Sequence, residues 1–143
     1  MNCIALNLPN YNIHKSLLSG IKNIPILYKL FAALIIFVMK YFTIINCTPL
    51  LYKKFNKLNT DILHINNGGY PAAFTAYSAV IAARLIGVKK IIYVVNNIAQ
   101  NYTSPLRWFD KMIDIYVRRK VSKFVTGSIN AGEKLKSILK LSR

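Results

Sequence analysis

From Asp61 to Gly132 the chain alternates short apolar, β-branched runs with polar loops and helix-like stretches. The run 61–66 is typical of a strand buried on both faces, and 91–95 predicts a second such strand. Strands that alternate with helices pair in parallel through helical crossovers. We therefore expect an α/β fold, with a partial doubly wound, Rossmann-like parallel sheet flanked by helices.

Local signals set the expected helix boundaries in this part of the chain. Pro71 opens a helix whose many alanines give it a small-residue surface suited to close packing on a sheet, and Gly87 ends it in the left-handed position. A single helix is expected over 107–121, followed by a short strand over 123–126. Ser128 is a good N-cap for a last helix over 129–140. Four side chains at helical spacing in the 107–121 helix predict a core-facing stripe: Trp108, Phe109, Met112 and Tyr116.

The most apolar part of the chain, 24–52, precedes these units. Its longest uninterrupted apolar run covers 30–39, roughly half of the ~20 residues that a spanning helix needs. Lys22, Lys29 and Lys40 fall close to one face of a helix, which gives it a narrow polar stripe. Pro25 and Pro49 bracket the segment, the first near a helix start and the second beyond a stop. We favour a buried or interfacial helix, and a marginal membrane span stays open.

The chain length allows one domain with a sizeable core. We expect a single domain over 1–143, with a basic, apolar helical lead-in over 1–58 and the β-α-β core over 59–143. A strand over 3–8 followed by a short helix over 13–21 is the interpretation of its beginning. No glycine-rich phosphate loop follows, so those routes to nucleotide binding are not supported. Cys3 and Cys47 have no metal-ligand or redox spacing, which excludes a metal site and fits free thiols in a reducing cytosol.

Twenty Lys and Arg face four acids, giving a net charge of +16. A chain so rich in Lys, Asn, Ile and Tyr is typical of an AT-rich genome, and this codon bias explains most of the excess. The remainder favours anionic partners, of which an anionic membrane surface is preferred. Nucleic acid is not the expected partner, because no zinc finger, RNP signature or arginine-rich arm accompanies the charge. The expected location is the cytoplasm, with peripheral attachment to the inner face of the membrane as an option.

The carboxyl ends of the predicted strands carry the candidate site, because open α/β sheets bind ligands at that edge. Amides there both donate to and accept from hydroxyls, and paired glycines let a ligand approach the backbone. The glycines also suit a turn, and the asparagines also suit capping of loop backbone. His64 is interpreted as a core residue with one hydrogen bond instead of a catalytic base. The candidate residues are Asn66, Asn67, Gly68, Gly69, Tyr70, Asn96, Asn97 and Ser128.

Four segments in this order resemble the amino-terminal domain of family 4 glycosyltransferases, which have the GT-B fold. They are Asp61–Pro71, Gly87–Lys90, Val94–Ala99 and Phe124–Ser128. The resemblance covers about the last eighty residues well and the first sixty mainly through the basic apolar helix. It implies retaining transfer of a sugar from a nucleotide-sugar donor, with this domain on the acceptor side of an interdomain cleft and no metal or other cofactor required.

The chain departs from the family pattern in three ways. The family's E-x7-E element, its donor-binding domain and its usual glycine-rich loop after the first strand are missing, and the only glutamate is Glu133. The resemblance therefore implies a fragment or split half of a glycosyltransferase, inactive alone, whose partners are a sugar or lipid-linked acceptor and a missing donor domain. The alternative is a non-enzymatic, basic, peripheral membrane-binding protein. A nucleic-acid-binding module ranks lowest, since it rests on charge alone.

Overall fold

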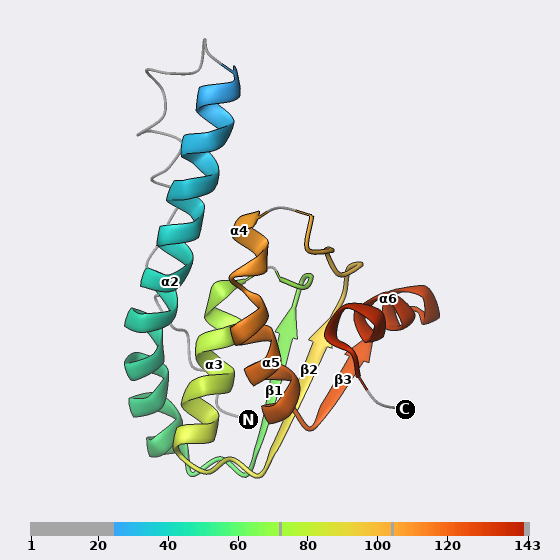
Figure 1. Ribbon diagram of the computed structural model, residues 1–143. Coiled ribbons are helices and arrows are strands. Elements are labelled where there is room, and N and C mark those ends of the chain that lie inside the picture. The colour runs from blue at the N-terminus through green and yellow to red at the C-terminus, as the bar shows by residue number, and fades with distance from the viewer. Residues whose placement is uncertain (1–24, 72, 104, 142–143) are drawn as a thin grey trace.

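A computed structural model describes residues 25–71, 73–103 and 105–141. It is an α/β structure with a small, open, parallel three-stranded sheet flanked by helices (Figure 1). The predicted strand over 3–8, the predicted helix over 13–21 and Lys22 lie outside the described residues. The elements in chain order are α2 (Pro25–Leu58), β1 (Ile62–Asn67), α3 (Phe74–Leu85), β2 (Lys90–Val95), α4 (Pro105–Trp108), α5 (Lys111–Lys120), β3 (Lys123–Thr126) and α6 (Ile129–Leu139).

The strands form a sheet in the order β1-β2-β3, and both neighbouring pairs are parallel. Leu63 pairs with Ile91 and Asn67 with Val95, while Val95 pairs with Thr126, so all three strands end at the same edge. The strand order runs in one direction through the described elements, and the crossover helices α3 and α5 contact each other. The described strands therefore follow chain order across the sheet without a reversal, and the predicted doubly wound arrangement is not seen among them.

The helix α3 confirms the predicted end of this segment but not its predicted start, since it begins at Phe74 and not at Pro71. It ends before Gly87, whose φ of +83° is the left-handed conformation expected there. Its small side chains are buried, but part of that surface packs on α2 instead of the sheet. Ala82 is fully buried beside Cys47 and Leu51, and the Ser78 hydroxyl donates to the Ile44 carbonyl at 3.4 Å. Small residues thus let two helices approach closely.

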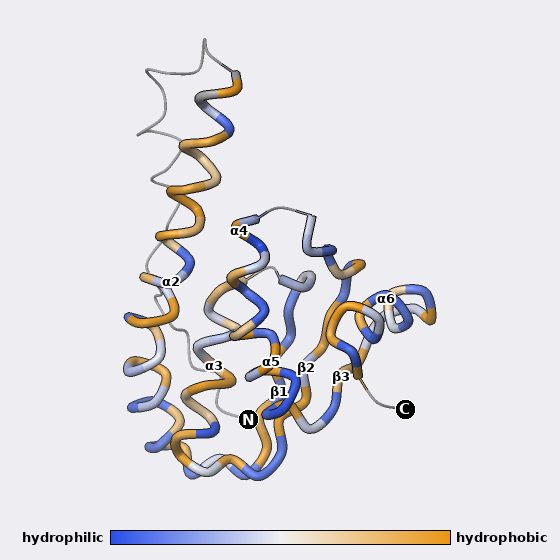
Figure 2. Tube along the Cα trace, viewed as in Figure 1, coloured by the Kyte–Doolittle hydropathy of each residue, from blue (hydrophilic) through white to orange (hydrophobic). Residues whose placement is uncertain are grey.

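The long helix α2 runs through Pro49, which the sequence had suggested as lying beyond its end. Cys47 and Leu51 are buried on either side of Pro49, and Phe55 also packs against this cluster. Packing on α3 therefore holds the helix together past the missing amide hydrogen. The first half of α2 extends beyond the sheet and is largely hydrophobic (Figures 1 and 2). Tyr28–Leu58 has the length and hydropathy of a membrane span, and 22% of its most apolar window is buried.

The predicted burial of the first strand on both faces is wrong. Ile65 and Asn67 are buried on the face that α3 covers, whereas Ile62 and His64 are exposed on the other. The core interpretation of His64 is therefore also wrong. No described helix covers that face of β1, and β1 pairs with β2 alone among the described strands. The central strand is better enclosed, with Ile91, Tyr93 and Val95 fully buried.

The predicted helix over 107–121 is two helices, α4 and α5, with a turn at Phe109 and Asp110. The apolar stripe predicted to face the core is mostly on the surface: Trp108 is 57% exposed, Phe109 63% and Met112 78%. Asp110 and Asp114 take the interior positions instead. The side of these helices that faces the protein is therefore charged, and the reason lies in what those carboxylates contact.

Candidate functional site

The carboxyl ends of the strands bring some of the predicted residues together. The Asn96 side-chain amide donates to the Asn66 side-chain oxygen at 2.8 Å, and both side chains are exposed. A Cβ placed on Gly127 would lie 3.8 Å from the Asn96 carbonyl oxygen, so the end of β3 lies beside the end of β2. We call Asn66, Asn96, Asn97, Gly127 and Ser128 the amide rim. It offers uncharged donors and acceptors at one edge of a parallel sheet.

Ser128 holds α6 in place at this rim. Its side chain accepts from the Ala131 amide at 3.2 Å, which confirms the predicted N-cap. The Thr126 hydroxyl donates to the Ser128 carbonyl at 3.2 Å. Ser128 therefore has a structural role first, and it fixes where the exposed backbone of the β3–α6 turn lies.

Three other predicted residues are buried away from the rim surface. Asn67 is 2% exposed, and its side chain donates to the Tyr93 hydroxyl at 2.7 Å and accepts from the Ala73 amide at 3.2 Å. Gly69 is buried and Tyr70 is 1% exposed. These residues hold the β1–α3 loop from inside, whereas Gly68 and Asn97 are exposed.

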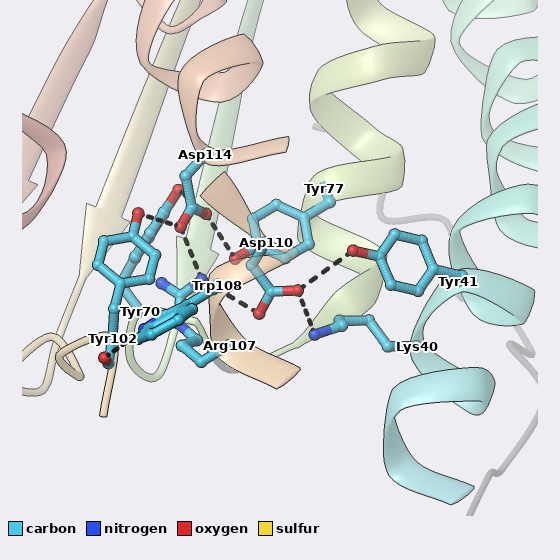
Figure 3. Close-up of polar contacts among 9 residues, drawn as sticks. All are labelled: Lys40, Tyr41, Tyr70, Tyr77, Tyr102, Arg107, Trp108, Asp110 and Asp114. Carbon is cyan, nitrogen blue, oxygen red and sulfur yellow. Dashed lines mark hydrogen bonds and ion pairs between the residues drawn. The ribbon is translucent and has the colours of Figure 1, made fainter. Parts of the chain in front are cut away.

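The most polar part of the interior was not foreseen. Figure 3 shows two carboxylates, Asp110 and Asp114, surrounded by donors from α2, α3, α4 and the loops. The oxygens of Asp114 accept from the Tyr70 hydroxyl at 2.8 Å, the Tyr77 hydroxyl at 3.2 Å, the Tyr102 hydroxyl at 2.7 Å and Arg107 Nη1 at 2.7 Å. An ionised carboxylate has about four acceptor positions, so Asp114 is saturated. It has no position left to act as a base.

Asp110 ties the long helix to this cluster. Its Oδ1 accepts from Lys40 Nζ and from the Tyr41 hydroxyl at 3.3 Å, and its Oδ2 lies 3.1 Å from Arg107 Nη1. Arg107 Nη1 thus lies between the two carboxylates. We call Lys40, Arg107, Asp110 and Asp114 the buried ion network; its two cations balance its two anions. Lys40, one of the lysines of the expected polar stripe of α2, therefore faces the interior of the protein and not the solvent.

Burial and negative neighbours raise the pKa of the surrounding phenols. Desolvation, followed by the charge of Asp110, raises the pKa of Tyr41 to about 12. Desolvation also raises the pKa of Tyr70, Tyr77, Tyr93 and Tyr102 well above the ordinary value. These tyrosines therefore keep their protons at neutral pH. The hydroxyls of Tyr41, Tyr70, Tyr77 and Tyr102 donate to the two carboxylates, whereas the Tyr93 hydroxyl accepts from Asn67.

Sequence reasoning missed the network, although one signal was present. Arg107, Asp110 and Asp114 are spaced by three and four residues, which is the spacing of neighbours on one helical face. Asp110 and Asp114 are also half of the four acids of the chain. Among the described residues no cluster of histidine, cysteine or carboxylate side chains could hold a metal ion.

A cavity of about 350 Å³ lies next to the network, between α2 and the segment that follows β2. Its lining includes Lys40, Arg107 and Asp110.

A second feature is electrostatic: exposed lysines and arginines gather at the opposite edge, where the strands begin. They are Lys53, Lys54, Lys57, Lys89, Lys90, Arg119, Lys120 and Lys123, and we call them the basic edge. Asp61 is the acid among them, 3.4 Å from Lys89 in an exposed ion pair of little energetic weight.

Comparison with known proteins adds no assignment. No family model, no curated protein and no solved structure matches the chain.

Proposed function

We propose that this domain forms the acceptor side of a sugar transferase of the GT-B type, whose donor-binding domain lies outside these 143 residues. The observation that carries the proposal is the amide rim, where three parallel strands end side by side and Asn66 and Asn96 present paired amides to solvent. Ligands of open α/β sheets bind at that edge. Uncharged amides match the hydroxyl groups of a sugar, which both donate and accept.

The described residues support binding better than catalysis. Asp110 and Asp114 are buried and occupied by donors, and both other acids are exposed: Asp61 precedes β1, at the opposite edge of the sheet, and Glu133 lies on α6. The charge that stabilises a leaving nucleotide diphosphate would have to come from the donor domain. We therefore expect the chain alone to bind an acceptor and to transfer little or no sugar.

A glycan array tests this proposal, probed with the wild-type chain and two variants. Asn96→Ala removes the amide that donates to Asn66, and we expect affinity for any bound glycan to fall by up to about tenfold, the value of one lost hydrogen bond. Asn46→Ala is the matched control, because Asn46 is also exposed and its amide also donates at 2.8 Å, to the Phe42 carbonyl of α2. Equal glycan binding by both variants, or none by the wild-type chain, contradicts the proposal.

A second candidate function is peripheral membrane binding without catalysis. The surface of α2 opposite to its packed side carries an apolar stripe, with Phe31 44% exposed, Leu34 49%, Val38 56%, Phe42 52% and Ile45 70%. An apolar helix face with lysines near one end is the pattern of interfacial helices. Lys53, Lys54 and Lys57 supply that charge.

Vesicles and glycans separate the two candidates. Binding to vesicles of phosphatidylcholine and phosphatidylglycerol that weakens with salt is expected for both, since a transferase working on a lipid-linked acceptor also docks on a membrane. Vesicle binding by a chain that binds no glycan on the array favours the non-enzymatic candidate. Glycan binding that Asn96→Ala weakens favours the transferase.

A further inference from the structure

The cavity beside the buried ion network has walls of two chemical kinds. One wall is apolar and the rest is polar, so the cavity fits neither a purely hydrophobic nor a purely charged ligand. The apolar lining includes Ala33, Phe37 and Phe74, and the polar lining includes Lys40, Gln100 and Asn101. Its volume of about 350 Å³ is at the low end of small-molecule sites, which hold roughly 300–1,000 Å³.

The charges in this cavity are already balanced. Lys40 is paired with Asp110, and Arg107 Nη1 lies 3.1 Å from Asp110 and 2.7 Å from Asp114. A phosphate placed here would have to compete with two buried carboxylates for the same cations. Hydroxyl groups face no such competition, because the exposed amides of Gln100 and Asn101 both donate and accept. The polar lining therefore favours an uncharged, hydroxyl-bearing group.

The position of the cavity gives an apolar chain a path. Pro71 and Gln100 follow the carboxyl ends of β1 and β2, and the backbone N–H of Gln100 donates to the Tyr70 carbonyl at 2.7 Å. The cavity thus lies at the same end of the sheet as the amide rim. The protruding half of α2 leaves the molecule at this end (Figure 1), and Leu30, 65% exposed and one turn before Ala33, continues its apolar surface.

We propose that this cavity binds an amphiphile whose uncharged sugar head contacts Gln100 and Asn101 and whose apolar chain runs along α2. The inference rests on the proposed function, because it makes the acceptor a lipid-linked sugar instead of a free one. The protruding part of α2 then serves as a surface on which the lipid chain lies. A bilayer in contact with α2 would present such an acceptor directly to this end of the sheet.

Calorimetric titration with decyl glucoside, below its micelle-forming concentration, tests the cavity. Glucose and decyl phosphate are the two comparison ligands, the first without a chain and the second with a charged head. We expect decyl glucoside to bind the wild-type chain about tenfold more tightly than either, since each loses one of the two contacts. Equal affinity for decyl phosphate overturns the proposal.

Two neighbouring alanines of α2 provide a matched pair of variants. Ala33 lines the cavity, whereas Ala32, one position earlier and similarly half-buried, does not belong to its lining. Ala33→Trp fills the cavity and should weaken binding of decyl glucoside by about tenfold, while Ala32→Trp should keep the wild-type affinity. Equal binding by the two variants would mean that the detergent coats α2 at large, and overturns the proposal.

A polar variant keeps the test decisive if Ala33→Trp does not fold. Gln100→Ala removes an exposed amide of the cavity and should weaken binding by several-fold. Unchanged binding by Gln100→Ala together with unchanged binding by any folded wall variant refutes the site. The amide-rim variant Asn96→Ala separates the two proposals: decyl glucoside binding that it leaves intact, but that the cavity variants lose, supports the cavity even where glycan binding at the rim has failed.

Discussion

Replacing Lys40 by methionine should detach α2 from the rest of the protein. Lys40 is 7% exposed and its partner Asp110 is 1% exposed, so the substitution leaves a carboxylate buried without its main cation. Breaking a buried ion pair on one side costs about 3–5 kcal/mol. Asp110 still has the Tyr41 hydroxyl at 3.3 Å and Arg107 at 3.1 Å. We therefore expect the lower end, a loss of about 3 kcal/mol in the free energy of unfolding.

A double-mutant cycle makes this magnitude specific to the pair. Lys40→Met leaves the buried ion network with a net negative charge and Asp110→Asn leaves it with a net positive one, whereas the double variant is neutral again. The double variant should be less destabilised than the sum of the singles, by about 2–3 kcal/mol of coupling. Urea unfolding followed by far-ultraviolet circular dichroism measures each free energy.

Lys29→Met is the matched control for this cycle, since Lys29 is exposed on the same helix. Its effect should stay within about 0.5 kcal/mol. A Lys40→Met variant as stable as this control, or single effects that simply add, would refute the view that the ion pair holds α2 in place.

Three further predictions concern the buried tyrosines, two glycines and two exposed isoleucines. The most deeply buried phenols are those of Tyr70, Tyr77 and Tyr93. Burial raises their pKa values in the folded chain, so they ionise near pH 10 only when the chain is unfolded. Their contribution to the free energy of unfolding is complete below about pH 10 and is lost above it, at up to about 4 kcal/mol per pH unit for three protons. A urea midpoint that does not decrease as the pH is raised from about 9 to about 11 would contradict this. Gly87→Ala should lower the unfolding free energy by about 1–2 kcal/mol, because its φ of +83° is unfavourable for a residue with a Cβ. Gly68→Ala is the control, since Gly68 also has open space for a Cβ but no left-handed φ, and it should change the unfolding free energy little. Equal urea midpoints for the two variants would disprove the strain argument. Ile45→Glu should reduce co-sedimentation with anionic vesicles, while Ile62→Glu on the exposed sheet face, 55% exposed against 70%, should reduce it less; a larger effect at Ile62 would place the membrane contact on the sheet.

The parts of the fold that the sequence predicted correctly depend on local chemistry. The positive φ of Gly87 and the cap made by Ser128 are decided within a few residues of each position. The three parallel strands follow from β-branched runs placed between helices. The exposed Asn66–Asn96 pair follows as well, because parallel strands end at one edge.

The errors have a different origin, since they depend on contacts between distant segments. Lys40 and Asp110 are 70 positions apart, and the local sequence around either residue does not predict their contact. Helical spacing marked Trp108 and Met112 as one face, but spacing does not say which face turns inward. The carboxylates turn inward because distant tyrosines, Arg107 and Lys40 satisfy them. Pro49 was misjudged for the same reason, because α3 supports the helix from outside it.

Nuclear magnetic resonance of the side-chain amides is the most direct test of the central claim, that the amide rim binds sugar. The chain labelled with nitrogen-15 would be titrated with the best glycan of the array, and the amide signals of Asn66, Asn96 and Asn97 followed against Asn46 on α2. The proposed function predicts saturable shifts of the three rim signals with Asn46 unchanged, because the rim amides hydrogen-bond to the sugar hydroxyls. Rim signals that stay in place while the Asn46 signal shifts would contradict it.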